Sequence, residues 1–126
     1  MSKHRSPETV LAVEHHRALQ SWLNDSGEDA LRRFKAAHDP DFTLVDVEGA
    51  RRDLSQLEDL LDGVGGSMPG LVIDITEVTL LAESGDLKLV RWTETHQGVG
   101  EPRIRIATAA LRNDRWLSVH ETFTQA

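Results

Sequence analysis

The 126-residue sequence contains no cysteine and no tyrosine, and aromatic residues make up only 5% of it. Without cysteine the chain can form neither a disulfide nor a thiolate metal site, and it has no thiol nucleophile. It also has no run near the ~20 apolar residues that a membrane-spanning helix needs, and its first residues lack the apolar core of a secretion signal. We therefore expect a single cytoplasmic domain covering residues 1–126.

Clustered basic residues are also missing. The net charge is −7 and the isoelectric point is about 5.3, and the arginines and lysines are scattered. Phosphate backbones and anionic membranes are bound by basic clusters, so neither nucleic acid nor a membrane is an expected partner. A glycine cluster at residues 63–66 lacks the preceding strand and the following Lys-Ser/Thr of a phosphate loop, so it predicts a flexible connection and no cofactor.

Three helices are predicted in the first half of the chain. Ser-Pro-Glu at residues 6–8 combines a capping side chain, proline in the first turn and an acid, so a helix should begin there and run to about residue 24. Its apolar stripe includes His15, either as a core histidine or as a pocket residue. Two more helices are predicted over residues 27–37 and 56–61, separated by short strands at 42–47 and 50–54.

The second half predicts strands to the end, over residues 71–83, 87–97, 103–112 and 115–123. Helices followed by an antiparallel meander predict an α+β fold, with helices over one face of a curved sheet. The facing of the 87–97 strand stays open, because turn length decides which alternate residues face the helices. The two sets are Leu89, Arg91, Thr93 and Thr95, or Val90, Trp92, Glu94 and His96.

The last two strands form a predicted hairpin around Asn113-Asp114, which pairs Arg112 with Arg115. An unbroken register places Thr108 opposite Val119 and makes one side a core face. That side carries Ile104, Ile106, Thr108, Ala110, Leu117, Val119, Glu121 and Phe123. Glu121 is then a carboxylate on an apolar face, which must be paired, protonated or used in chemistry.

Two stretches resemble a known superfamily: HDPDFTLVDVEG at 38–49 and TAALRNDRWLSVHETF at 108–123. With the order of elements, they resemble the NTF2-like cone fold, specifically its SnoaL-like and DUF4440 branch, over nearly the whole chain. The resemblance implies three N-terminal helices packed on the concave face of a strongly curved, mainly antiparallel sheet. It also implies a homodimer through the convex face. Because this fold hosts isomerases, dehydratases, hydrolases, carriers and assembly domains, it does not name an activity.

Ketosteroid isomerase offers a residue-by-residue test of this resemblance. Its catalytic aspartate matches Asp46, but its two oxyanion-stabilising residues match about Leu19 and Thr108, which cannot replace a tyrosine and a protonated aspartate. Losing one such donor costs about 3–4 kcal/mol of transition-state stabilisation. A steroid-isomerase mechanism is therefore not expected.

A pocket between the helices and the sheet is expected, with Asp46 and Glu121 as a candidate acid/base pair. Each carboxylate also has a structural alternative: Glu121 could pair with an arginine, and Asp46 could cap the turn at residues 48–49. No metal site is expected, because the histidines lack ligand spacing. The predicted lining comprises His15, Leu19, Trp22, Phe42, Leu44, Arg91, Ile106, Thr108, Val119 and Phe123.

The outer side of the last hairpin predicts a dimer interface at Trp116, Ser118 and His120, where small residues around a tryptophan suit a flat partner surface. Two functions stay open. One is an enzyme of the isomerase, dehydratase or hydrolase kind, with Asp46 and Glu121 transferring protons. The other is a non-catalytic dimer for sensing or assembly. The missing donors favour a homodimer that binds a small, largely apolar molecule.

Overall fold

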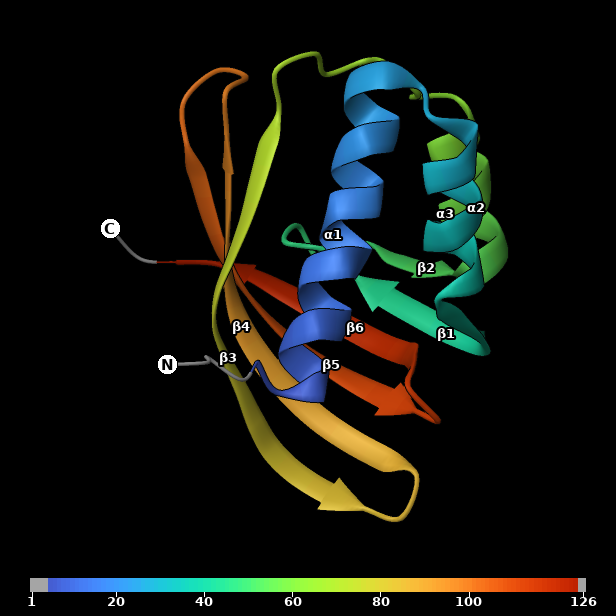
Figure 1. Cartoon of the computed structure of the whole chain (residues 1–126), viewed down its shortest axis with the longest axis vertical. Helices are drawn as coiled ribbons and strands as arrows, with labels where there is room; N and C mark the ends of the chain where they lie inside the picture. Colours follow the sequence, from blue (N-terminus) through green and yellow to red (C-terminus); the bar gives the residue numbers. More distant parts are fainter. Residues whose placement is uncertain (1–4, 125–126) are drawn as a thin grey trace.

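The computed structural model describes residues 5–124, which fold into three helices and one six-stranded curved sheet (Figure 1). The strand order is β2-β1-β6-β5-β4-β3, with β1 parallel to β6 and the other neighbours antiparallel. The predicted α+β class is confirmed, although only two helices precede the first strand. The elements are α1 (Pro7–Asp25), α2 (Glu28–Ala36), β1 (His38–Val45), β2 (Arg51–Asp53), α3 (Leu54–Asp62), β3 (Val72–Ser84), β4 (Leu87–Gln97), β5 (Arg103–Arg112) and β6 (Arg115–Phe123).

Two of the three helices, α1 and α3, begin at side-chain caps that the local sequence supplies. The Ser6 hydroxyl accepts a hydrogen bond from the Thr9 amide at 3.2 Å, and Pro7 follows in the first turn of α1. At α3, Asp53 and Gln56 form a reciprocal capping box, with bonds of 2.8 and 2.9 Å. Figure 1 shows α1 lying across the concave face of the sheet, with α2 and α3 beside β1 and β2. Among the described residues, no helix has both the length and the apolar character needed to cross a bilayer.

A β-bulge in the last hairpin overturns the register predicted from the sequence. Arg112 does pair with Arg115, as predicted. Beyond that pair, Leu111 lies opposite Trp116 and Ala110 lies opposite Ser118, which leaves Leu117 as an extra residue on β6. One extra residue reverses which side chains of the partner strand share a face. Thr108 therefore pairs with His120 instead of Val119.

The bulge places different β5 residues in the core from those predicted. Ala107, Ala109 and Leu111 are at most 1% exposed, and Arg105 shares their side of the strand. Ile106 and Thr108 point to the convex face, so their predicted place in the pocket lining is wrong, and Ile104 is 44% exposed.

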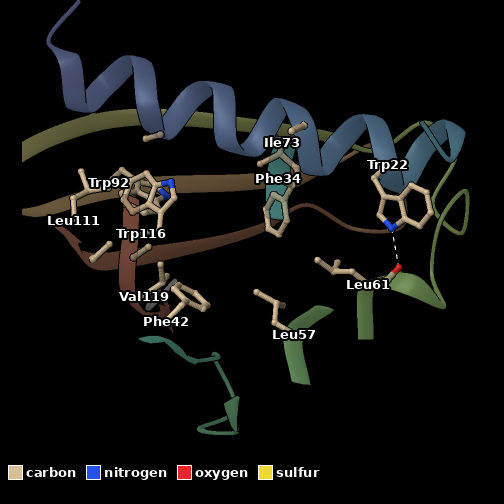
Figure 2. Close-up of a cluster of buried hydrophobic side chains, with 14 of the residues drawn as sticks. Trp22, Phe34, Phe42, Leu57, Leu61, Ile73, Trp92, Leu111, Trp116 and Val119 are labelled. Atoms are coloured by element: carbon tan, nitrogen blue, oxygen red, sulfur yellow. Dashed lines mark hydrogen bonds between the residues drawn. The ribbon is translucent and has the colours of Figure 1, made fainter. Parts of the chain in front are cut away.

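Trp116 is a core residue, so its predicted place in a dimer interface is wrong. Its side chain is 1% exposed and packs against Trp92 with ring centroids 5.4 Å apart (Figure 2). The small side chains of Ala107 and Ala109 leave room for these two indoles above the sheet. The bulge explains the difference, because it rotates Trp116 away from Ser118 and His120, which stay on the convex side.

The facing of β4 is the second of the two open sets: Val90, Trp92 and Glu94 are fully buried beneath the helices. Arg91 lies on the opposite side, where its Nε donates to the Thr108 hydroxyl at 3.2 Å. The prediction that Arg91 lines the pocket is therefore wrong.

The glycine cluster is packed against the end of α1. The Trp22 indole donates to the Leu61 carbonyl at 2.8 Å (Figure 2), and a Cβ on Gly65 would come within 2.5 Å of that ring. The amide of Gly66 also bonds to the Trp22 carbonyl at 2.9 Å. Trp22 thus anchors this connection, and it does not line the cavity described below.

We predict that Trp116→Arg unfolds the protein, because it places an unpaired charge at a site that is 1% exposed. His120→Arg, at an exposed site on the convex face, should leave the urea midpoint nearly unchanged. If the homodimer predicted through that face forms, His120→Arg should also convert it to a monomer in sedimentation experiments. A folded, monomeric Trp116→Arg variant would contradict the observed register.

Candidate functional site

A cavity of about 140 Å³ lies between the concave face of the sheet and the three helices. Six of the predicted site residues line it: His15, Leu19, Phe42, Leu44, Val119 and Glu121. Its apolar wall is completed by Phe34, Leu57, Leu61 and Trp92, and its further polar residues are His16, His38, Glu94, His96 and Arg105. Eight of the fifteen lining residues are therefore apolar or aromatic, and the other seven carry ionisable side chains.

Glu94 is the centre of the polar network in this cavity. Its side chain is 2% exposed, and its Oε1 accepts a hydrogen bond from the Trp92 indole at 3.0 Å. The same oxygen lies 2.9 Å from Nε2 of His16, while Oε2 bonds to Nε2 of His96. Three ring nitrogens therefore surround one buried carboxylate, which satisfies both of its oxygens.

Glu94 and His16 form a buried ion pair that links β4 to α1. Burial alone would raise the pKa of Glu94, but the charge and hydrogen bonds of His16, together with His96 and Trp92, hold that pKa well below its usual range. Burial would likewise lower the pKa of His16, yet the Glu94 carboxylate raises it above the ordinary value. The His16 Nδ1 also donates to the Ala12 carbonyl at 2.8 Å, so both ring nitrogens have acceptors.

The pKa of Glu121 is shifted in the opposite direction from that of Glu94. Its Oε1 lies 3.5 Å from Nη1 of Arg105, which the bulge brings to the core side. Burial and repulsion from Glu94 raise the pKa of Glu121, and they outweigh the attraction of Arg105 and the histidines. The predicted pairing of Glu121 with an arginine is thus present, with a separation of 3.5 Å from Arg105. Glu121 still takes up a proton more readily than an ordinary glutamate.

His15 and His38 are uncharged near neutral pH. Burial and the neighbouring histidines hold the pKa of His15 well below its usual value. Burial lowers the pKa of His38 to about 4. The two rings lie edge to face, with centroids 4.8 Å apart, and both contact Phe34.

Asp46 is not part of this site. It lies at the turn between β1 and β2, where Oδ1 accepts from the amides of Glu48 and Ala50 and Oδ2 accepts from Arg52 at 2.7 Å. The hydrogen bond from Arg52 is the main reason its pKa is lowered. The structural alternative of a turn cap is therefore realised, and Asp46 and Glu121 do not form an acid/base pair.

Sequence reasoning missed most of the polar site. Glu94 and His96 belonged to one of the two possible faces of β4, and knowing the length of the turn before β4 would have identified that face as the buried one. Arg105 was placed on the wrong side by the unrecognised bulge. Phe123 was expected in the pocket, but its side chain is 45% exposed and contacts the Arg105 guanidinium, 5.8 Å from the ring centroid, outside the lining. Within residues 5–124, no group of three or more histidine and carboxylate side chains is arranged to hold a metal ion.

Comparison with known proteins finds similar solved structures but no match to the sequence among family models or curated proteins. A solved NTF2-like protein of unknown function from Pseudomonas aeruginosa is 29% identical, with a TM-score of 0.84 over 90% of this chain and 95% of that one.

Two more distant structures share the fold. A candidate ketosteroid isomerase from Parabacteroides distasonis is 14% identical, with a TM-score of 0.65 over 97% of this chain and 90% of that one. The beta subunit of benzoate 1,2-dioxygenase from Burkholderia mallei is 12% identical, with a TM-score of 0.69 over 98% of this chain and 93% of that one. The curved sheet, the helices on its concave face and the likeness to the Pseudomonas aeruginosa structure place the chain, by its fold, in the NTF2-like superfamily.

Proposed function

We propose that this protein binds a small, largely apolar molecule, about the size of one six-membered ring, in the cavity beneath α1. The observation that carries the proposal is the cavity of about 140 Å³, which combines eight apolar or aromatic side chains with seven ionisable ones. Small-molecule sites are usually concave and apolar with few polar groups. A protein cavity of about 150 Å³ is large enough for benzene.

The polar groups of the cavity differ in their freedom to contact a ligand. Glu94 already accepts bonds from Trp92, His16 and His96, so it holds these rings in place and has little capacity left for a ligand. Glu121 is 3.5 Å from its arginine partner and has a raised pKa. We therefore assign Glu121 and Arg105 as one polar contact point for the bound molecule.

Acid catalysis is a second candidate function, and the opposed pKa shifts of the two glutamates favour it. Environments that push two carboxylates apart often mark an acid/base assignment. Here Glu121 would give a proton to an oxygen of the ligand, whereas Glu94 would stay ionised and orient the histidines. An isomerase, dehydratase or hydrolase of the SnoaL-like branch would use Glu121 in this way without Asp46. That branch assignment stays a prediction.

Binding can be tested with toluene and cyclohexane as ring-sized probes in a thermal-shift experiment. Ligand at 100 times its dissociation constant adds about 2.7 kcal/mol, which raises the melting temperature by several degrees in a domain of this size. Val119→Phe should abolish the shift, because the larger ring fills the cavity that Val119 lines.

Ile104→Phe is the matched control, since Ile104 is 44% exposed on the convex face. It should keep the wild-type response. No shift in wild-type protein with either probe, or an equal shift in folded Val119→Phe, would overturn the proposal.

The two buried glutamates should respond oppositely to replacement by glutamine. Glu94→Gln leaves the His16 imidazolium without its counter-charge, so it should cost about 3 kcal/mol or more at pH 7. Glu121→Gln should leave the free energy of unfolding at pH 7 unchanged or higher, because it removes a carboxylate that burial disfavours. Urea unfolding measures both.

The contributions of the two glutamates to the free energy of unfolding should change in opposite directions with pH. The folded-state pKa of Glu94 is lowered, so its contribution is present above the ordinary glutamate pKa and is lost as pH falls. The folded-state pKa of Glu121 is raised, so its contribution is present below that value and is lost as pH rises. Equal losses of stability in the two variants at pH 7 would contradict this assignment.

A further inference from the structure

Two buried imidazole nitrogens in the cavity have no protein partner among the described residues: Nδ1 of His15 and Nε2 of His38. Both side chains are more than nine-tenths buried, with exposed fractions of 8% and 4%. Leaving a buried polar atom without a hydrogen bond is unfavourable, because the atom has lost its contact with water and gained no partner in exchange. Both residues line the ligand cavity, so a bound molecule is a natural source of the missing contacts.

The hydrogen-bonding role of His38 follows from its other nitrogen. Its Nδ1 lies 3.4 Å from the Lys35 carbonyl, which can only accept, so the ring proton belongs on Nδ1. Nε2 is then a lone-pair acceptor in the neutral ring. It needs a donor.

His15 completes a two-point site with His38. The ring centroids are 4.8 Å apart and the rings meet edge to face, so the two unpartnered nitrogens belong to neighbouring rings that both line the cavity. Nδ1 of His15 can carry a proton and act as a donor, because no donor from the described residues lies against it and imposes the other tautomer. A hydroxyl group is both donor and acceptor, so it satisfies both rings at once.

We propose that the cavity selects a ring-sized alcohol or phenol whose hydroxyl group donates to Nε2 of His38 and accepts from Nδ1 of His15. This inference rests on the proposed binding function and names its ligand class. The ring of the ligand would lie against the apolar wall formed by Phe34, Phe42 and Leu57. An apolar ring without the hydroxyl would fill the same space and leave both nitrogens unsatisfied.

The experiment compares the dissociation constants of phenol and toluene, which are close in size, for wild-type protein and for His38→Phe. The phenylalanine ring preserves the aromatic contacts with Phe34 and Phe42 but has no acceptor. The preference for phenol over toluene should fall about tenfold or more in the variant, since the hydroxyl loses its acceptor. Toluene affinity should be nearly unchanged. His120→Phe, at an exposed position on the convex face, should keep the wild-type ratio.

A ¹⁵N spectrum of the wild-type histidines gives a second readout that needs no variant. Phenol should move the Nε2 resonance of His38, and toluene should leave it nearly unchanged. If toluene binds but the phenol preference is the same in His38→Phe, or if phenol leaves that resonance unmoved, the hydroxyl assignment is wrong while the cavity proposal stands. If neither compound binds, the cavity proposal itself fails, and this inference fails with it.

Discussion

The buried ion pair between Glu94 and His16 is the interaction on which the rest of the site depends. It joins the middle of β4 to α1 across the core, with an oxygen–nitrogen separation of 2.9 Å. Two charges removed from water are tolerated only when each is paired and its remaining hydrogen-bonding capacity is used. Trp92 and His96 meet that condition for Glu94, and the Ala12 carbonyl meets it for His16.

The pair also determines the charge of its neighbours. Burial raises the pKa of Glu121 and the negative Glu94 raises it further, so this carboxylate takes up a proton more readily than an ordinary glutamate. The positive His16 lowers the pKa values of His15 and His38, which reinforces the effect of burial. The ion pair thus favours the neutral forms of Glu121, His15 and His38, three of the ionisable groups that line the cavity.

The sequence predicted the order of elements well because helix caps, turn residues and hydrophobic periodicity are local signals. Ser6 at the start of α1 and Asn113 at the last turn both act as expected. Local signals did not predict which alternate residues of the two strands in the last hairpin share a face. The extra residue Leu117 has no distinctive side chain, and the bulge it forms is favoured by the tertiary packing of Trp116 beneath α1.

That single error spread to the predicted site, because strand residues alternate between faces. Because of it, the prediction placed Thr108 in the pocket, Trp116 outside the core and Arg105 on the opposite side of the sheet from Glu121. His15 and Leu19, two of the six lining residues that were identified correctly, lie on α1, whose facing does not depend on strand register. Asp46 failed for a different reason, since the amides of its own turn and Arg52 already use its oxygens.

The most direct test of this account is an NMR titration of the individual histidine rings in the wild-type protein. We predict that His16 remains protonated above pH 6.5, the ordinary histidine value. His15 should stay neutral at pH values well below 6.5, and His38 should stay neutral until the pH approaches about 4. Three histidines that all titrate near pH 6.5, or a neutral His16 beside a neutral Glu94 at pH 6, would contradict the ion pair and the charge pattern that it imposes.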